Sequence, residues 1–390
     1  MGPLHALFVL LALHGRARAE PSCRCDGDYR TKNGLVWGDA VRMNQVQVIG
    51  SHNSYHVEAS SAEKKVMEEL SPSVQDLFYG HDALDVQLQE QHLRSLEIDV
   101  LADPDGGLYA KPLVRQLAHL PDLDDPAYKR PGTKVMHVPD LDVNTHCTTL
   151  AGCLGAIKTW VDAHPKALPL GIVIELKTAT ALGAALGGAK VVPWDDAKLL
   201  DGLDAEIRSA FGQSGQLITP DDIRRPGHTL EESVLKFGWP NLDSARGKIF
   251  FLLDNDHDDK ASVRYRENRP NLEGRVIFTN SVPGNTDCAF QKLEDVVTDA
   301  YVTRIQTQVR AGYWVRAMAD DALSTVRKCT TSQRDMALRS GAQIVSTDFF
   351  VPGKSERYGC KGYVVGLGEN KVARCNPVNG RAGCADGDLE

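Results

Sequence analysis

The feature that most constrains the fold of this chain is a repeated alternation of short apolar runs with amphipathic stretches. Eight runs rich in Ile, Val or Phe have the composition of buried strands: 46–50, 95–101, 134–138, 171–177, 248–253, 275–279, 313–318 and 342–347. Between them, apolar residues recur three and four positions apart, as in Leu150, Leu154 and Ile157, which is the spacing of a helix face packed on a core. Strands that alternate with helices predict a parallel sheet of the α/β class.

Eight strand and helix units favour a closed (β/α)8, TIM-like barrel over an open doubly wound sheet. No GxGxxG motif follows the first predicted strand, as a dinucleotide-binding fold would require. The stretch 179–247 is too long for one crossover, so we expect extra helices or an elaborated loop there. The periodicity then fades into Gly, Asn and Cys after residue 350. We therefore predict a barrel over residues 20–350 and a small disulfide-containing C-terminal appendage over 351–390.

Residues 1–19 have the pattern of a secretory signal peptide. Residues 4–13 form a short apolar run, and Ala17-Arg18-Ala19 is the small-x-small pattern that signal peptidase cleaves. The run is shorter than the roughly 20 residues that a membrane-spanning helix needs, and we find no other stretch that is long and charge-free enough. We expect a secreted, extracellular monomer that begins at Glu20 and has no transmembrane segment.

The charge balance argues against a nucleic-acid partner. The chain has 44 Lys and Arg residues against 52 Asp and Glu residues, a net charge of -8. Cleavage after Ala19 would remove Arg16 and Arg18 but no acid, so 44 - 2 = 42 basic residues would face 52 acidic ones, a net charge of -10. A chain of this sign repels polyanions at long range, so affinity for phosphate must come from a local site.

Nine cysteines in an exported chain indicate disulfides, and an odd number leaves at least one without a partner in the chain. Cys147 and Cys153 are close enough in sequence to close a small loop. Cys360, Cys375 and Cys384 lie in the Gly-rich tail, where a disulfide replaces the core that such a segment lacks. The connectivity is left open, and no pair has the spacing of a zinc ribbon.

Ionisable and amide side chains gather at four successive predicted strands, on the edge where a barrel of this type carries its active site. These residues are His52, Asn53, Glu97, Asp99, His137, Glu175 and Lys177. Residues i and i+2 of a strand share a face, so Glu97 and Asp99 point to the same side. Carboxylates crowded into a barrel mouth need a cation, and oxygen ligands suit calcium. The sequence therefore predicts a calcium site, with salt-bridged or surface carboxylates as the alternative.

Two of the 12 histidines stand out by position. His52 and His137 follow the first and third predicted strands, where their rings can flank one phosphate group. An imidazole titrates near neutral pH, so the pair can act as general base and general acid on a phosphodiester. Three weaker candidates near the same edge are His56, His146 and His257. We expect the others of this group to be structural or solvated: His81, His92, His119, His164 and His228.

The acid-rich turn 254–259 begins like an EF-hand loop but does not continue like one. Position six is Asp259 where the motif needs Gly, and position twelve is Tyr265 where it needs Glu. We therefore expect no EF-hand site. Asp254 ends a predicted strand and can face the active site, whereas a solvated acidic turn is the alternative.

These motifs resemble the catalytic X region of phosphatidylinositol-specific phospholipases C, and most closely the small, secreted, calcium-dependent bacterial type. The resemblance is carried by Gly50-Ser51-His52-Asn53-Ser54-Tyr55, Leu96-Glu97-Ile98-Asp99, His137 and Ile174-Glu175. It implies that calcium is held by Asn53, Glu97, Asp99 and Glu175. Calcium-independent bacterial enzymes have an Arg on the second strand, where this chain has acids. Beyond the fourth predicted strand the resemblance is one of layout only.

The resemblance also implies an activity, the cleavage of phosphatidylinositol in membranes to diacylglycerol and a cyclic inositol phosphate by attack of the inositol 2-hydroxyl. His52 would stabilise the pentavalent phosphorus and assist proton removal, and His137 would protonate the leaving oxygen. The larger animal enzymes follow the Glu of the fourth strand with Asn and His, whereas Leu176 and Lys177 stand here. Expected substrate contacts are Lys177, Asp254, Arg316 and Asp348, the last three with a structural salt bridge as the alternative. No basic cluster is present to bind extra ring phosphates.

Two apolar segments on the predicted active face, 191–194 and 349–352, are candidates for membrane insertion, with packing under the barrel rim as the alternative. Two other functions stay open. One is a glycerophosphodiester hydrolase or sphingomyelinase D, whose motif begins with His-Arg where this chain has His52-Asn53. The other is a non-catalytic lipid-binding barrel, which predicts damage to a catalytic or metal-binding residue, and the sequence shows none.

Overall fold

The structure is a computed structural model that describes residues 29–70, 72–178, 187–368 and 371–390. The predicted signal peptide, Cys23 and Cys25 lie outside these residues. Among the helices in the described ranges, none combines the length and the apolar character that crossing a membrane requires.

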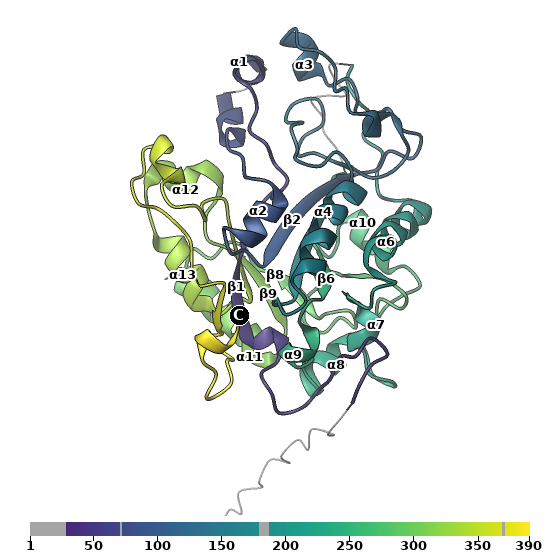
Figure 1. Cartoon of the computed structure of the whole chain (residues 1–390), viewed down its shortest axis with the longest axis vertical. Helices are drawn as coiled ribbons and strands as arrows, with labels where there is room; N and C mark the ends of the chain where they lie inside the picture. The colour runs from purple at the N-terminus through teal and green to yellow at the C-terminus, as the bar shows by residue number, and fades with distance from the viewer. Residues whose placement is uncertain (1–28, 71, 179–186, 369–370) are drawn as a thin grey trace, which may run out of the picture.

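A ring of parallel strands forms the centre of the molecule (Figure 1). In chain order they are β1 (Val46–Ser51), β2 (Ser95–Leu101), β4 (Leu170–Leu176), β6 (Ile249–Leu253), β7 (Ile277–Phe278), β8 (Phe290–Lys292), β9 (Trp314–Met318) and β10 (Ile344–Thr347). Neighbours in this order are paired in parallel, and β7 reaches β8 through a parallel bridge between Asn280 and Phe290. β10 pairs with β1 and closes the ring. The predicted TIM-like barrel is confirmed.

Helices follow the strands around the barrel. The longer ones are α1 (Ser61–Leu70), α4 (Leu150–Ala163), α6 (Ala197–Phe211), α11 (Asp299–Ala311) and α13 (Ser332–Ser340). The shorter ones are α2 (Leu84–Gln89), α3 (Leu113–Leu117), α7 (Pro220–Ile223), α8 (Leu230–Lys236), α9 (Leu242–Ala245), α10 (Lys260–Arg266) and α12 (Ala322–Lys328). Short 3-10 turns are η1 (Met43–Gln45), η2 (Pro72–Leu77), η3 (Pro126–Lys129), η4 (Lys354–Tyr358) and η5 (Asp386–Asp388).

Local sequence explains how these helices begin and which face they bury. Thr149 caps α4 by accepting the Gly152 N–H at 3.1 Å, and the predicted apolar stripe of that helix is buried. Asp196 caps α6 in the same way through the Lys198 N–H at 2.9 Å. The expected extra helices before β6 are present as α6 to α9, together with β5 (Leu217–Ile218), which pairs with β6.

One predicted strand, 134–138, is not part of the barrel. It contains only β3 (Lys134–Val135), which pairs antiparallel with the end of β2. Val135 and Met136 are apolar because they are buried beside the barrel, not within its wall. The barrel strand that the sequence analysis missed is β8, whose three residues include Gln291 and Lys292 and therefore give little apolar signal.

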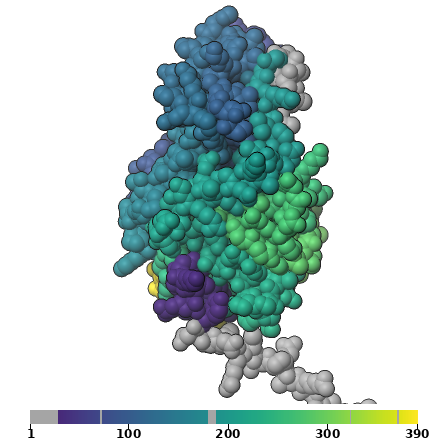
Figure 2. Space-filling model, turned by 90° about the vertical axis from the view of Figure 1, so that its right-hand side faces the viewer, coloured from purple at the N-terminus to yellow at the C-terminus, as the bar shows by residue number. Residues whose placement is uncertain are grey.

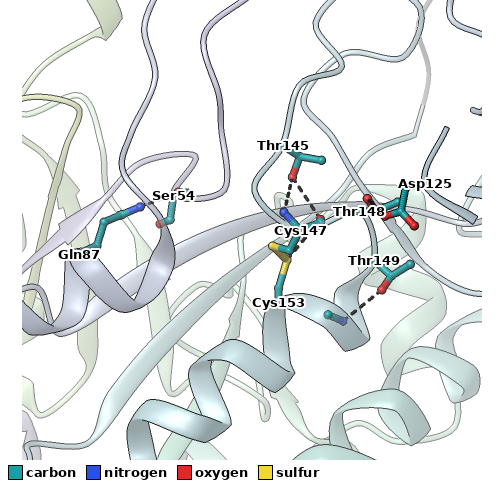
Figure 3. The surroundings of a disulfide bond; sticks show 9 residues. Ser54, Gln87, Asp125, Thr145, Cys147, Thr148, Thr149 and Cys153 are labelled. Carbon is teal, nitrogen blue, oxygen red and sulfur yellow. Dashed lines mark hydrogen bonds between the residues drawn. A yellow bond between two sulfur atoms is a disulfide. The ribbon is translucent and has the colours of Figure 1, made fainter. Parts of the chain in front are cut away.

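A lobe formed by residues 57–81 and 102–149 stands at one end of the barrel, at the top of Figures 1 and 2. It has a core of its own that includes Met67, Val114 and Met136. The Cys147–Cys153 disulfide ties the end of the lobe to α4, as Figure 3 shows. This bond confirms the small loop that the spacing predicts.

Residues 351–368 and 371–390 pack against the barrel (Figure 1). β11 (Ala373–Cys375) pairs antiparallel with β1, and Tyr363 and Val365 are buried in the same cluster as Phe349. The disulfides Cys329–Cys360 and Cys375–Cys384 bind this segment to α12 and to itself, whereas Cys288 is a buried free thiol. The predicted tail disulfides are therefore present, and the division into barrel and appendage stays a prediction.

The aromatic residues of the two apolar segments are not available for membrane insertion. Trp194 is 2% exposed, Phe349 is 0% exposed and Phe350 is 8% exposed. Of the two alternatives for these side chains, packing under the rim is the correct one.

Candidate active site

The turn that follows β1 is anchored to β2 by Ser54. Its N–H donates to the Glu97 carbonyl at 3.0 Å, and its Oγ accepts the Glu97 N–H at 2.7 Å. The Ser54 carbonyl accepts the Gln87 amide at 2.7 Å (Figure 3). Asn53 has a φ of 45°, in the left-handed region that Asn tolerates better than most residues. These contacts fix His52 and Asn53 beside the carboxylates of β2.

His52 is oriented by Asp348, which directly follows β10. Its Nδ1 lies 3.2 Å from both carboxylate oxygens, and Asp348 is buried. Burial favours the neutral imidazole, but the Asp348 and Glu97 charges raise the pKa of His52 to about 10. The same pairing overcomes burial and holds the pKa of Asp348 well below its usual range. Nδ1–H is thereby committed to Asp348, and Nε2, which lies 3.3 Å from the Asn53 amide nitrogen, is the ring atom that remains for chemistry.

His137 comes from the lobe and not from a barrel strand. Its Nδ1 lies 2.8 Å from Asp142 Oδ2, and His56 Nε2 lies 2.7 Å from the same oxygen. Burial alone would raise the pKa of Asp142, but His56 and His137 hold it well below the usual range. The ring of His56 lies 5.8 Å from that of His137 and 4.6 Å from that of Tyr79, centroid to centroid. Tyr79 in turn stacks near His52 at 6.4 Å, so ring contacts link the two candidate catalytic histidines.

Buried carboxylates of three neighbouring strands converge in the barrel mouth. Glu97, Glu175 and Asp254 each place an oxygen within 4.8 Å of the others. Burial raises the pKa of Glu97 to about 8 and that of Glu175 to about 7. Nearby acids add to both shifts, while Arg316 and His52 oppose the shift of Glu97 and Lys177 opposes that of Glu175. Asp99 lies in register with Glu175, and its Oδ1 has no hydrogen-bond partner in the described part of the chain.

Three basic side chains are paired with this cluster. Arg316 is almost fully buried and contacts Glu97, while its Nη1 lies 2.6 Å from both Asp254 and Glu294. Lys177 Nζ forms ion pairs with Asp99 at 2.9 Å and with Glu175 at 3.0 Å. Lys292 Nζ forms an ion pair with Asp254 at 2.8 Å. Lys292, the last residue of β8, and Glu294, two residues after it, were not predicted because β8 was missed.

The sequence matches the family model described as phosphoinositide phospholipase C, Ca2+-dependent, over residues 41–377. The chain belongs to this family. It is therefore a calcium-dependent phospholipase C, a phosphodiesterase, and calcium is its cofactor.

Solved structures of two bacterial phospholipases C are similar to this one. The calcium-dependent phosphoinositol-specific enzyme of a Gram-negative Pseudomonas species is 14% identical, with 86% of this chain and 96% of that chain covered and a TM-score of 0.49. The Ca2+-dependent phosphatidylinositol-specific enzyme of Streptomyces antibioticus is 15% identical, with coverages of 80% and 96% and a TM-score of 0.49. No sequence among the curated proteins gives a significant match. The family assignment rests on the match over residues 41–377.

The donor set of this phospholipase C fits a calcium ion. Glu97, Glu175 and Asp254 supply crowded carboxylate oxygens, and Asp99 supplies a buried oxygen without a hydrogen bond. The raised pKa values of Glu97 and Glu175 express the cost of placing several buried acids together, and a divalent cation removes that cost. Asp254, which we expected to contact substrate, is the member of this set that the sequence analysis did not assign to the metal.

The acid-rich turn and the weaker histidine candidates make hydrogen bonds with other parts of the protein. The Asn255 side chain bonds both the N–H and the carbonyl of Leu176, and Asp259 caps α10, so the acid-rich turn has a structural role beyond Asp254. His146 Nε2 lies 2.8 Å from the His81 carbonyl, and His257 Nε2 lies 3.0 Å from the Asn285 amide.

One of the histidines expected to be structural or solvated lies directly beside the candidate site. His81, expected to be structural or solvated, is buried against the Asp348 carboxylate. No motif in the sequence marks this position, because its partner is far away along the chain.

Proposed function

We propose that this enzyme cleaves phosphatidylinositol into diacylglycerol and a cyclic inositol phosphate, with the inositol 2-hydroxyl as the nucleophile. The observation that carries the proposal is that His52 and His137 each bond a buried aspartate through Nδ1 and are linked to each other by the ring contacts of Tyr79 and His56, while the charge of Glu97 acts on His52. Such a pair leaves two Nε2 atoms available for one phosphodiester.

His52 stabilises the phosphorus at which the hydroxyl attacks. Its raised pKa, about 10, keeps the ring protonated at neutral pH, so Nε2–H donates to a phosphoryl oxygen as negative charge develops there. Asp348 holds the ring in this orientation from the neighbouring strand end. Assistance of His52 in removing the hydroxyl proton, which the family resemblance implies, would require the neutral ring, with Nε2 free to accept that proton.

His137 supplies the proton that the diacylglycerol oxygen needs as it leaves. Asp142 accepts Nδ1–H at 2.8 Å, which fixes the tautomer and directs Nε2 away from the aspartate. Because His137 is 17% exposed in its side chain, whereas His56 is fully buried, His137 is the ring that substrate can reach. Reversal of these proton transfers then opens the cyclic product with water.

The calcium ligands of this proposal are Asn53, Glu97, Asp99 and Glu175, with Asp254 added on structural grounds. When bound, calcium lowers the pKa of the 2-hydroxyl and neutralises charge at phosphorus. Lys177 stays a proposed substrate contact, whereas Asp254 is assigned to the metal. Arg316 and Asp348 are almost fully buried in ion pairs with Glu97 and His52, the structural alternative that the sequence left open for them. Lys177, Arg316 and Lys292 are all paired with carboxylates, which supports a substrate without additional ring phosphates.

The setting of the reaction is part of the same proposal: a signal peptide over 1–19, a barrel over 20–350 and an appendage over 351–390 make a secreted monomer that contacts membranes transiently. Three disulfides in the described part of the chain support an oxidising compartment.

Product analysis by mass spectrometry tests the function. The purified protein is mixed with vesicles of phosphatidylinositol, phosphatidylcholine or sphingomyelin, in calcium or in a chelator, beside the variant His137→Ala. Diacylglycerol from phosphatidylinositol alone, only with calcium and not with the variant, is the expected result. Ceramide phosphate or phosphatidic acid would place the cut at the other ester bond, as in a sphingomyelinase D, and the absence of any product would contradict the proposal.

A further inference from the structure

His81 is buried directly behind the candidate catalytic His52. Its Nε2 lies 2.9 Å from the His52 carbonyl oxygen and 3.3 Å from Asp348 Oδ1. On the other side of the ring, Nδ1 lies 2.9 Å from Nζ of Lys354, the first residue of η4. A continuous chain of contacts therefore runs from His52 through Asp348 and His81 to Lys354.

The partners of His81 define its protonation state. A carbonyl and a carboxylate have no hydrogen to donate, so Nε2 must carry the ring proton. An ammonium has no acceptor, so Nδ1 must be unprotonated to receive a hydrogen from Lys354. His81 is therefore a neutral imidazole of the Nε2–H tautomer. Burial and the Lys354 charge lower its pKa to about 4, in agreement with these contacts.

We propose that Lys354 and His81 are positioning residues: the Lys354 ammonium keeps His81 neutral, so that the Asp348 carboxylate is left to hold His52. This inference rests on the proposed role of His52. A protonated His81 would be a second cation 3.3 Å from Asp348 and would compete with His52 for the same oxygen. The segment that supplies Lys354 lies beyond residue 350, so the C-terminal residues contribute directly to the site.

The surroundings of His81 prevent the ring from choosing other partners. Phe350 stacks on it with a centroid distance of 5.2 Å, and Tyr79 meets it edge-on at 5.6 Å. Its backbone is tied on both sides, since its N–H donates to the His56 carbonyl at 2.9 Å and its carbonyl accepts from His146.

Charged groups of both signs surround His81 and Lys354. Asp348, Lys354 and His56 act on His81, and Asp348, Arg357, Asp82 and Glu58 act on Lys354. Burial lowers the pKa of Lys354 to about 8, so the ammonium is the main species at pH 7. The Cys329–Cys360 disulfide fastens the segment that carries Lys354 to α12.

Nitrogen-15 NMR of the histidine rings of the full chain at pH 7 tests the inference without any need for activity. We expect the wild type to show His81 as the neutral Nε2–H tautomer and Lys354→Met to show it as an imidazolium. In the assay with phosphatidylinositol vesicles, Lys354→Met should lower kcat about 10-fold with KM changed less than about twofold, and Lys354→Arg should restore most of the loss. Lys361→Met, an exposed lysine of the same segment, is the matched control and should behave as wild type.

Each other outcome overturns the inference. An imidazolium at His81 in the wild type contradicts the assigned protonation, and this result needs no variant to fold. A neutral His81 in Lys354→Met contradicts the claim that Lys354 keeps the ring neutral. Wild-type kcat in Lys354→Met contradicts the positioning role. If the wild type cleaves no phosphatidylinositol, the proposed function fails, and the two NMR spectra alone decide between the assigned protonation and its rejection.

Discussion

The barrel and the lobe hold their candidate catalytic histidines in the same manner but by different means. His52 follows a barrel strand, and its aspartate, Asp348, comes from the adjacent strand end, 296 positions away in sequence. His137 and its aspartate, Asp142, are five positions apart within the lobe, and His56 shares that carboxylate. The geometry at His52 therefore depends on closure of the barrel, whereas the geometry at His137 depends on a local core that other segments can change independently.

The largest effect should come from removing the lobe histidine itself. His137→Asn removes the proposed general acid, so we expect kcat to fall about 10³-fold while calcium binding is retained. His119→Asn, an exposed lobe histidine whose φ of 55° suits Asn, serves as the control. Steady-state kinetics and calcium titration of both variants measure the effect. A loss below about tenfold would mean that the lobe contributes no proton to the reaction.

Substitution of Asp348, the partner of His52, and of Asp142, the partner of His137, compares the barrel with the lobe. Asp348→Asn and Asp142→Asn should each lower kcat about 10- to 100-fold, because each ring loses the acceptor that fixes its tautomer. Both variants should also cost about 1–3 kcal/mol of unfolding free energy, since a fully buried histidine loses a partner in each: His56 in Asp142→Asn and His81 in Asp348→Asn. Because His81 Nε2 keeps its contact with the His52 carbonyl, the loss should be smaller in Asp348→Asn, and a larger loss there would contradict these contacts.

The stability that Asp142 contributes should depend on pH in a defined direction. Its pKa is held below the usual value by His56 and His137 against the effect of burial, so its stabilisation is present above the unfolded pKa of about 3.9 and is lost as the pH falls below it. Urea unfolding of wild type and Asp142→Asn between pH 3 and pH 7 should therefore give a free-energy difference that is constant near neutrality and shrinks in acid. A difference that grows in acid would refute the pairing.

Core truncations test the independence of the lobe. Met136→Ala in the lobe and Ile172→Ala in the barrel both remove fully buried side chains and should each cost about 2–5 kcal/mol. Only Met136→Ala, next to His137, should also lower the kcat of the folded protein, by about tenfold. Urea unfolding and kinetics below the unfolding transition separate the two quantities, and equal kcat values would show that the lobe core does not position His137.

The stabilisation by calcium should be confined to the barrel. The pKa values of Glu97 and Glu175 are raised to about 8 and about 7, chiefly by burial, so without metal the unfolded chain loses these protons first and stability falls as the pH rises from about 4.3 toward 8. Calcium at 100 times its Kd should add about 2.7 kcal/mol. Thermal unfolding should show that this gain increases with pH, and hydrogen exchange should show protection in β2, β4 and β6 but not in the lobe. Protection centred on the lobe would place the ion at His56 and His137 instead.

The barrel strands with a strong apolar pattern could be predicted from the sequence, and the short or polar ones could not. Ser95–Leu101 alternates apolar and acidic residues, and Leu170–Leu176 is an apolar run that ends with one acid, so Glu97, Asp99 and Glu175 were found. β8 is short and polar, so Lys292 in it and Glu294 two residues after it were missed. The apolar residues of 134–138 were read as a barrel strand because burial in the lobe gives the same signal as burial in a sheet.

Contacts between residues that are distant in sequence could not be predicted from strand and helix patterns. His81 and Lys354 are 273 positions apart, and neither has a local pattern that marks it. The Asp142 site is local, but a carboxylate five residues after a histidine has no characteristic motif. Only the fold, which brings the end of β10 against β1, makes the first pair visible.

Phosphorus-31 NMR of the products released from phosphatidylinositol vesicles in calcium shows directly whether the inositol 2-hydroxyl is the nucleophile. We expect that a cyclic inositol phosphate appears first and is later opened to an acyclic monoester, and that neither forms in the presence of a chelator. An acyclic product with no cyclic precursor, a phosphatidic acid signal, or unchanged turnover in the chelator would contradict this expectation.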